Sequence, residues 1–303
     1  KVCEKIPFFE EWIPETLIKT YGWPDWQTCV KQIHAPTSES HLDLQDKRRQ
    51  RLAFDEFFAS QLSLLLMRGV QEGKPGRAFI KPHGFSLRES FLSLLPFVMT
   101  GDQQKVIAEI DREMASSTRM LRLLQGDVGT GKTVVAMASL LNAIECGAQG
   151  ALMAPTEVLA RQHAKTLLPW LEALGIKGAC LTGSDKEKDR RRIYEEVSNA
   201  CIKLLIGTHA LIQDDIKFQD LGLVVIDEQH RFGVEQRLKL VQKGNSPDVL
   251  SMTATPIPRT LMLASYGDLS CSYLREKPTN RQSVVTSLIS LDRLEEVMGR
   301  LVT

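Results

Sequence analysis

A glycine-rich stretch, GDVGTGKT at residues 126–133, constrains this chain more than any other feature. Gly126, Gly131, Lys132 and Thr133 match the pattern G-x-x-x-x-G-K-[ST], in which a loop between a strand and a helix holds phosphate groups. The apolar run LRLLQ precedes the loop and the helix-like run KTVVAMASLLNAI follows it, as the pattern requires. The stretch predicts a phosphate-binding loop in an α/β fold.

Glycine suits such a loop because the backbone can bend until successive N–H groups point inward at phosphate oxygens. The positive end of the following helix adds to the attraction. We expect Lys132 to reach the β- and γ-phosphates and the Thr133 hydroxyl to hold Mg²⁺. The loop residues predicted to bind the nucleotide are Gly126, Val128, Gly129, Thr130, Gly131, Lys132 and Thr133.

Two carboxylates follow another apolar run. Asp227 and Glu228 come directly after LGLVVI, and ligands bind at the carboxyl ends of strands in parallel sheets. Adjacent carboxylates repel each other unless a cation neutralises them. We expect Asp227 to hold Mg²⁺ and Glu228 to polarise the attacking water, with Lys132 and Glu228 as the catalytic residues. The two motifs predict an ATPase with ATP and Mg²⁺ as cofactors, without indicating what its ATP hydrolysis drives.

Short apolar runs alternate with helix-like segments over residues 86–281. Strands that are buried on both faces read as continuous apolar runs, and helices between them imply a parallel sheet. We therefore predict an α/β domain with a parallel central sheet flanked by helices. The runs are LRLLQ, GALMAP, GACLTG, IKLLIGT, LGLVVIDE and DVLSMTAT.

The flanking segments are predicted to differ from this domain. Residues 1–85 should form a helical arm, with short turns first and then a long helix from Asp46 to a stop at Gly69, followed by a connector. We expect the tryptophans and the Phe-rich helix of the arm to pack on the α/β domain rather than recruit a partner. Residues 282–303 should begin a second, truncated α/β unit, with a strand in SVVTSLIS and a helix in LDRLEEVMGRLV.

The composition is typical of a soluble globular protein and does not by itself indicate a nucleic-acid or membrane partner. The net charge is +1, hydrophobic residues make up 43% and charged residues 25% of the chain. No apolar run approaches the ~20 residues that a membrane helix needs. The six cysteines form no C-x-x-C pair, which favours scattered reduced thiols over a metal or disulfide framework.

Four motifs resemble those of superfamily 2 helicases. APTEVLARQH resembles motif Ia, GTHAL motif Ib, DEQH motif II and TAT motif III, in the order of that superfamily. Together with MTATPIPRTL and DEQHRFGVEQR, they resemble the RecG family of ATP-dependent DNA helicases, which remodel branched DNA. The resemblance covers nearly the whole chain and implies a RecA-like first motor lobe. A transcription-repair coupling translocase, an RNA helicase and a nucleotide-dependent interaction module without turnover stay open as alternatives.

The resemblance also implies residue roles. PFVMTGDQ is similar to a nucleotide-base motif, in which Gln103 would bond the adenine and Phe97 would pack nearby. HRFGVEQR, with Phe232 as an exposed aromatic and with Gln236 and Arg237, would relay the nucleotide state to DNA. The residues expected to couple hydrolysis to DNA are Gln229, His230, Arg231, Thr253 and Thr255. Those expected to contact DNA phosphates are Pro155, Thr156, Arg161, Gln162, Thr208 and His209.

The family further implies branched or duplex DNA as partner, no membrane association, a monomer, and a bacterial cytoplasmic location. Its motor uses two RecA-like lobes, and the second lobe supplies an arginine that stabilises the transition state of hydrolysis. We find no motifs of that lobe in this sequence, so we expect the chain alone to hydrolyse ATP very slowly.

Overall fold

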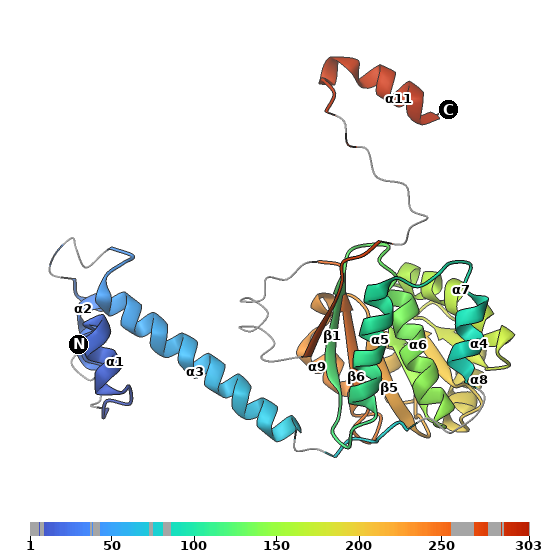
Figure 1. Cartoon of the computed structure of the whole chain (residues 1–303), viewed down its shortest axis with the longest axis horizontal. Helices are drawn as coiled ribbons and strands as arrows, with labels where there is room; N and C mark the ends of the chain where they lie inside the picture. The colour runs from blue at the N-terminus through green and yellow to red at the C-terminus, as the bar shows by residue number, and fades with distance from the viewer. Residues whose placement is uncertain are drawn as a thin grey trace.

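Seven parallel strands form one sheet in the structure, a computed structural model that describes residues 6, 9–36, 38, 43–72, 75–80, 86–255, 270–277, 286 and 288–302. The strand order is β3-β4-β2-β5-β6-β1-β7, and neighbouring strands are parallel. Figure 1 labels β1, β6 and β5, which are neighbours in this sheet. The predicted parallel sheet is confirmed, and each of the six apolar runs supplies a strand. The strands are β1 (Leu121–Gly126), β2 (Gln149–Met153), β3 (Gly178–Leu181), β4 (Leu204–Gly207), β5 (Leu221–Ile226), β6 (Asp248–Thr253) and β7 (Ser270–Leu274).

Helices cover both faces of the sheet, which is why its central strands are apolar throughout. Leu223 and Val225 of β5 lie in one buried cluster with residues of α5 and α6, whereas Val224 and Ile226 lie in a second cluster with residues of α8 and α9. Burying each such side chain contributes about 1.5–3 kcal/mol. The helices of this region are α4 (Leu87–Leu94), α5 (Gly101–Met114), α6 (Lys132–Glu145), α7 (Glu157–Ala173), α8 (Glu187–Ser198) and α9 (Val234–Val241), with short 3₁₀ turns η3 (His209–Ile212) and η4 (Gln229–Arg231).

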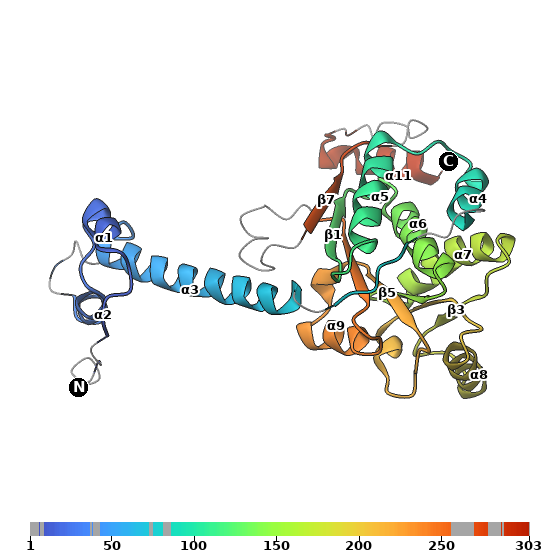
Figure 2. The same cartoon turned by 60° about the horizontal axis from the view of Figure 1, so that its bottom comes forward.

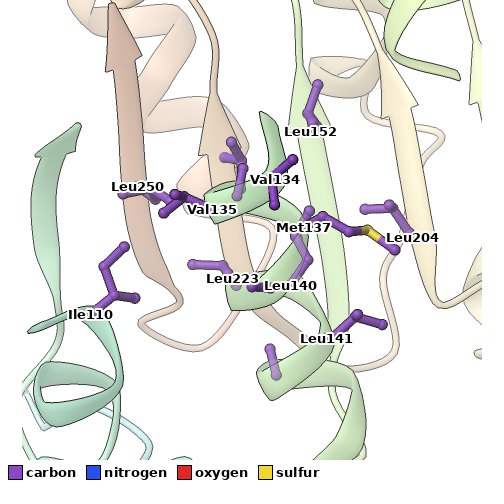
Figure 3. Packing of buried hydrophobic residues seen from close by; sticks show 14 of the residues in the cluster. Ile110, Val134, Val135, Met137, Leu140, Leu141, Leu152, Leu204, Leu223 and Leu250 are labelled. Carbon is purple, nitrogen blue, oxygen red and sulfur yellow. The ribbon is translucent and has the colours of Figure 1, made fainter. Parts of the chain in front are cut away.

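Helix α6, which begins at the glycine-rich loop, lies directly on the sheet. Figure 3 shows its apolar side chains beside those of four strands. Val135, Met137, Leu140 and Leu141 are completely buried. This packing fixes the first turn of α6, and therefore the loop before it, relative to the ends of the strands. The labelled strand residues are Leu152, Leu204, Leu223 and Leu250.

Strand β7 was not anticipated from the sequence. It pairs with β1 at the edge of the sheet, with Ser272 opposite Leu124. Its sequence, SCSYL, is only partly apolar, because an edge strand buries less of its surface than a central one. The Ser272 hydroxyl donates a hydrogen bond to Glu109 on α5, so even its polar positions are used in packing.

The arm consists of α1 (Glu15–Tyr21), α2 (Trp26–His34) and a long helix α3 (Lys47–Glu72). The helix predicted from Asp46 is confirmed, but its predicted stop is wrong, because α3 continues through Gly69 to Glu72. A glycine inside a helix costs about 1 kcal/mol relative to alanine, which a helix of this length tolerates. Although α3 is long, no helix in the described ranges is apolar enough over sufficient length to cross a membrane.

Aromatic side chains of the arm pack on one another and not on the α/β domain. The ring centroids of Trp12 and Phe58 lie 5.2 Å apart, and those of Trp23 and Phe54 lie 5.0 Å apart. Figures 1 and 2 both show α3 extending away from the sheet. The expectation that these residues pack on the α/β domain is therefore wrong. The aromatic surface is used locally instead, around the completely buried Arg51.

Part of the connector is docked against the α/β domain. Gly76 N donates to Ser117 O at 2.8 Å, and Phe79 N donates to Met114 O at 2.7 Å. The Phe79 ring is only 2% exposed. Arg77 forms an ion pair with Asp220, just before β5. The described residues 75–80 thus hold the connector against the end of the sheet at which β5 begins.

The predicted helix near the carboxyl end of the chain is present as η5 (Leu291–Arg293) and α11 (Leu294–Val302). Four of the eight residues of the strand predicted in SVVTSLIS, 283–285 and 287, lie outside the described residues, and the other four, 286 and 288–290, do not form a strand. The assignment of residues 282–303 to a second unit stays a prediction, as do the boundaries at residues 85 and 281.

A buried carboxyl should make stability depend on pH. Asp248 begins β6, is 1% exposed and accepts a hydrogen bond from Met120 N at 2.7 Å. Burial raises the pKa of its carboxyl to about 7, against the opposing effects of that bond and of Arg119. The folded protein then binds the proton more tightly than the unfolded chain. The unfolding free energy should fall as pH rises from about 4 to about 7, by at most ~1.4 kcal/mol per pH unit.

We expect Asp248→Asn to remove this dependence, because the amide oxygen can still accept from Met120 N and carries no proton to lose. The melting temperature of the variant should rise relative to that of the wild type progressively between about pH 4 and about pH 7. The exposed Asp189→Asn on α8 is the control, and its difference from the wild type should stay constant. A constant difference for Asp248→Asn as well would contradict the prediction.

Candidate functional site

The glycine-rich loop joins the end of β1 to the start of α6. Gly129 and Gly131 have φ values of 83° and 86°, in the left-handed region that side chains with a Cβ rarely enter. A Cβ on Gly131 would lie 2.1 Å from Gln103 Nε2, so this position also needs glycine for space. The N–H groups of the first turn of α6 face the loop side of the helix and offer partial positive charge there. The loop therefore has the geometry of an anion cradle.

The Lys132 ammonium group reaches back across this loop. It lies on the side of Asp227 and Glu228, the two carboxylates after β5, which are called the acidic edge below. Its Nζ donates to the carbonyl oxygens of Gly126, at 2.6 Å, and Asp127, at 3.0 Å. Burial lowers the pKa of Lys132, while the charges of Asp227 and Glu228 oppose that lowering. The loop follows β1 and the carboxylates follow β5, and only β6 separates these two parallel strands in the sheet. The fold thus brings the loop and the carboxylates to the same end of the sheet.

The two carboxylates are held differently. Asp227 is 8% exposed, and its Oδ1 accepts from Glu228 N at 3.0 Å. Glu228 has a φ of 47°, a conformation that costs a non-glycine residue about 1–3 kcal/mol and occurs mostly at functional sites. Its carboxylate accepts from Ala254 N at 3.3 Å. This turn directs adjacent carboxylates to different partners, as their predicted roles require.

Thr253 and Thr255 connect these carboxylates to the end of β6. Thr253 Oγ1 donates to Glu228 Oε2 at 3.4 Å and lies 2.9 Å from Thr255 Oγ1. Gln125 Nε2, at the end of β1, donates to Thr255 O at 3.3 Å. Since β6 lies between β5 and β1 in the sheet, the threonines lie between the acidic edge and the phosphate loop. The coupling role predicted for them stays a prediction.

Gln103 is completely buried and supports the loop. Its amide oxygen accepts from Thr100 N at 3.0 Å, and its amide nitrogen donates to Thr130 O at 2.8 Å. The first contact closes a capping box at the start of α5. Both ends of the amide therefore have protein partners, and the predicted adenine contact stays a prediction.

Phe97 lines a surface cavity of about 540 Å³ just before α5. The other lining residues are Leu92, Leu95, Pro96, Val98, Met99 and Gln104. A mostly apolar hollow with an amide at its margin suits a flat heteroaromatic ring. Phe97 thus has the surroundings expected of a residue beside the adenine, while Gln104 rather than Gln103 faces this cavity.

The predicted DNA contacts lie at the ends of β2 and β4, which are neighbours in the sheet. Thr156 caps α7 by accepting from Leu159 N, and Pro155 precedes it. Thr208 is 1% exposed, and its hydroxyl has no partner among the described residues. His209 and Gln162 are exposed. These residues thus lie at the same end of the sheet, after the carboxyl ends of two neighbouring strands. Their contact with DNA stays a prediction.

Arg161 is already engaged within the protein. Its Nη2 forms an ion pair with Asp185 Oδ1 at 2.9 Å and donates to Thr182 Oγ1 at 2.9 Å. The side chain is 53% exposed, so the pair is solvent-screened and contributes little to stability. A phosphate would have to compete with Asp185 for this guanidinium.

The segment after the carboxylates is more buried than expected. Phe232 was predicted to be an exposed aromatic, which is wrong, because its ring is 9% exposed and belongs to the second buried cluster. Phe232 directly follows the turn η4, with an extended backbone. Gln229 is 3% exposed, with an amide nitrogen that lacks a partner within the described ranges, whereas Arg231 is exposed. The His230 side chain lies outside the described residues.

One contact at the acidic edge was missed by sequence reasoning. His163 Nε2, on α7, lies 2.8 Å from Asp227 Oδ2, and both side chains are nearly buried. His163 ends the motif APTEVLARQH, but no local pattern indicates that its ring would reach a carboxylate 64 positions later. The helical phase of α7 relative to β5, which decides the contact, arises only on folding.

The steric role of Gly131 leads to a prediction. Gly131→Ala should weaken nucleotide binding strongly, because the new methyl group would displace the Gln103 amide from Thr130. Gly147 is a matched control, with a φ of 90° and, apart from its chain neighbours, nothing within 4 Å of the place that a Cβ would take. Both variants bear a left-handed strain of about 1–2 kcal/mol in unfolding experiments, but only Gly131→Ala should lose binding of a fluorescent ATP analogue. Equal binding by the two variants would contradict this explanation.

Comparisons with known proteins cover the part of the chain that contains the candidate site. Residues 100–263, just over half of the chain, match the family model described as DEAD/DEAH box helicase. The chain is 50% identical over 278 residues to the ATP-dependent DNA helicase RecG of Synechocystis, covering 92% of this chain and 33% of the relative. It is 44% identical over 289 residues to RecG of Bacillus subtilis, covering 95% and 42%.

A solved structure of RecG bound to a three-way DNA junction matches with a TM-score of 0.75 and 39% identity. That match covers 97% of this chain and 39% of the solved one. The chain therefore spans about a third to two fifths of the length of these RecG proteins. The helicase match includes the glycine-rich loop, the carboxylates and the Thr253–Thr255 segment. The chain belongs to the DEAD/DEAH box helicase family and is a homologue of the RecG ATP-dependent DNA helicases.

Proposed function

We propose that this chain is the nucleotide-binding first lobe of a RecG-type motor, which uses ATP hydrolysis to remodel branched DNA by fork reversal and branch migration. The main support is that the loop with Lys132, after β1, and the carboxylates Asp227 and Glu228, after β5, lie at the same end of the parallel sheet with only β6 between them. A triphosphate in the loop would place its γ-phosphate beside both the ammonium and the acidic turn. The similarity to a RecG structure bound to a three-way DNA junction supports branched DNA as the partner.

In this proposal the chain's own residues bind and orient ATP. Loop N–H groups and the start of α6 would surround the phosphates, and Lys132 would leave its carbonyl partners to neutralise the γ-phosphate. The cavity beside Phe97 would hold the base. Gln103 would act chiefly by keeping Thr130, and with it the loop, in place.

Mg²⁺ fits the donors that are present. Thr133 and Asp227 supply oxygen atoms, which this cation prefers. Within the described ranges, no three His, Cys, Asp or Glu side chains gather to hold a metal by themselves. This suits Mg²⁺, which takes one or two protein ligands and completes its shell with phosphate oxygens and water. When bound, the cation would neutralise charge on the phosphates.

Glu228 is proposed to orient the attacking water and accept its proton. Its strained backbone turns the carboxylate away from Asp227 and toward the end of β6. Any movement of Glu228 during hydrolysis would change its bonds to Thr253 and Ala254. Through Thr255 this change would reach the end of β1, which gives a physical route from hydrolysis to the rest of the lobe.

The test is ATP hydrolysis by the full-length protein with different nucleic acids. Three-way junction DNA should stimulate hydrolysis more than linear duplex DNA or single-stranded RNA at the same low salt concentration. Salt must be fixed, because phosphate contacts weaken steeply as it rises. Equal stimulation by linear duplex would instead favour a duplex translocase of the transcription-repair type. Nucleotide binding without any turnover would favour an interaction module, and RNA-specific stimulation an RNA helicase.

A further inference from the structure

The Asp227 carboxylate is held at both oxygens by the protein. Oδ1 accepts from Glu228 N at 3.0 Å, and Oδ2 lies 2.8 Å from His163 Nε2. An ionised carboxylate only accepts hydrogen bonds, so the imidazole donates through Nε2. Two contacts on opposite oxygens fix the plane of the carboxylate, which a single contact would leave free to rotate. The oxygens nevertheless keep further lone pairs for a water or a cation.

The contact is sheltered from solvent. The His163 side chain is 12% exposed and the Asp227 side chain 11%. A hydrogen bond to a charged group in such surroundings is stronger than the same bond at the surface. Loss of the imidazole would leave one carboxylate oxygen without a donor and allow the group to turn.

Helix α7 places this imidazole rigidly. Ala160, Ala164, Leu167 and Leu171 form its completely or nearly buried face, so the helix cannot rotate without disturbing the core. His163 lies six residues after the first residue of α7, a rise of about 9 Å along the helix. The cap of α7 is Thr156, one of the predicted DNA contacts. Helix α7 therefore connects Thr156, which is expected to contact DNA, to His163, which contacts Asp227.

We propose that His163 is a positioning residue that holds Asp227 for metal–nucleotide binding, and that α7 transmits contact with DNA to this carboxylate. The proposal rests on the proposed function, since it assumes that Asp227 serves a nucleotide-bound cation. Partners outside the metal's own ligands commonly matter in this way, and their loss costs about 10–100-fold in metal affinity or activity.

Three variants of the full-length protein test the positioning role. His163→Leu removes the donor while keeping a similar volume, and His163→Gln keeps an N–H group at a similar reach. Lys165→Leu changes an exposed residue of the same helix and serves as the control. The readout is binding of a fluorescent ATP analogue, titrated with Mg²⁺ and repeated with a chelator in place of Mg²⁺.

We expect His163→Leu to raise the Mg²⁺ concentration for half-maximal binding by about 10–100-fold. Binding with chelator should not change, His163→Gln should recover most of the loss, and Lys165→Leu should match the wild type. Equal losses with and without Mg²⁺ would mean that His163 only packs, and an unchanged Mg²⁺ requirement would mean that Asp227 needs no such support. Either result overturns this proposal alone, whereas a wild-type protein that binds no nucleotide overturns the proposed function and this proposal together.

The transmission through α7 has its own measurement. Junction DNA should shift the Mg²⁺ requirement of the wild type, and by thermodynamic linkage Mg²⁺ should shift its affinity for DNA by the same factor. That shift should shrink in His163→Leu and persist in Lys165→Leu. An equal DNA-induced shift in all variants would show that the coupling takes another route.

Discussion

Full-length protein carrying Glu228→Gln is expected to hydrolyse ATP about 10²–10⁴-fold more slowly at saturating junction DNA, which is the usual contribution of a general base. Glutamine keeps the size of the side chain and an oxygen that can accept from Ala254 N. It cannot take a proton from water. Nucleotide affinity should stay close to that of the wild type, since Glu228 is not proposed to touch the phosphates. Phosphate release and binding of a fluorescent ATP analogue measure the two quantities.

The matched control is Glu187→Gln on α8, which removes an exposed carboxylate whose ion-pair partner is Arg191. That pair contributes little, because both side chains are largely in solvent. Hydrolysis by Glu187→Gln should stay at the wild-type rate. If Glu228→Gln also kept its rate within a few-fold, another group would have to activate the water, and the acidic turn would be a metal site only.

The parts of the fold that were predicted are those that local sequence determines. LGLVVI reads as a central strand because both of its faces are buried, which leaves no polar alternation. GDVGTGKT predicts its loop because only glycine accepts the φ values at positions 129 and 131. By contrast, β7 pairs along only one edge and keeps serines, so its composition does not distinguish it from a loop.

Errors arose where a local signal competed with a distant one. Gly69 has the low helix propensity of a stop, yet α3 continues past it. Phe232 follows a polar motif and suggested an exposed ring, but the ring belongs to the second buried cluster. The His163 contact to Asp227 could not be predicted, because it depends on how α7 is rotated over the sheet. Residue types at the site were therefore readable from the sequence, whereas the contacts that hold them were not.

A polypeptide that contains only residues 1–303 is expected to bind ATP and to hydrolyse it about 10³–10⁵-fold more slowly than the full-length protein. The chain spans 33% of the Synechocystis RecG relative and 42% of the Bacillus subtilis one, and a two-lobe motor places ATP between its lobes. The proposed partner lobe would supply the arginine that stabilises charge on the transferred phosphoryl group, and that contribution has the stated size.

Binding and turnover should therefore separate. The loop, Lys132 and Asp227 all lie within this chain, so the fluorescent ATP analogue should still bind, and Lys132→Ala should abolish that binding. Junction DNA should leave the slow rate unchanged, because the arginine that stabilises charge on the γ-phosphate would come from the proposed second lobe. DNA-stimulated hydrolysis by residues 1–303 at the full-length rate would show that one lobe suffices, and the two-lobe mechanism would then have to be abandoned for this protein.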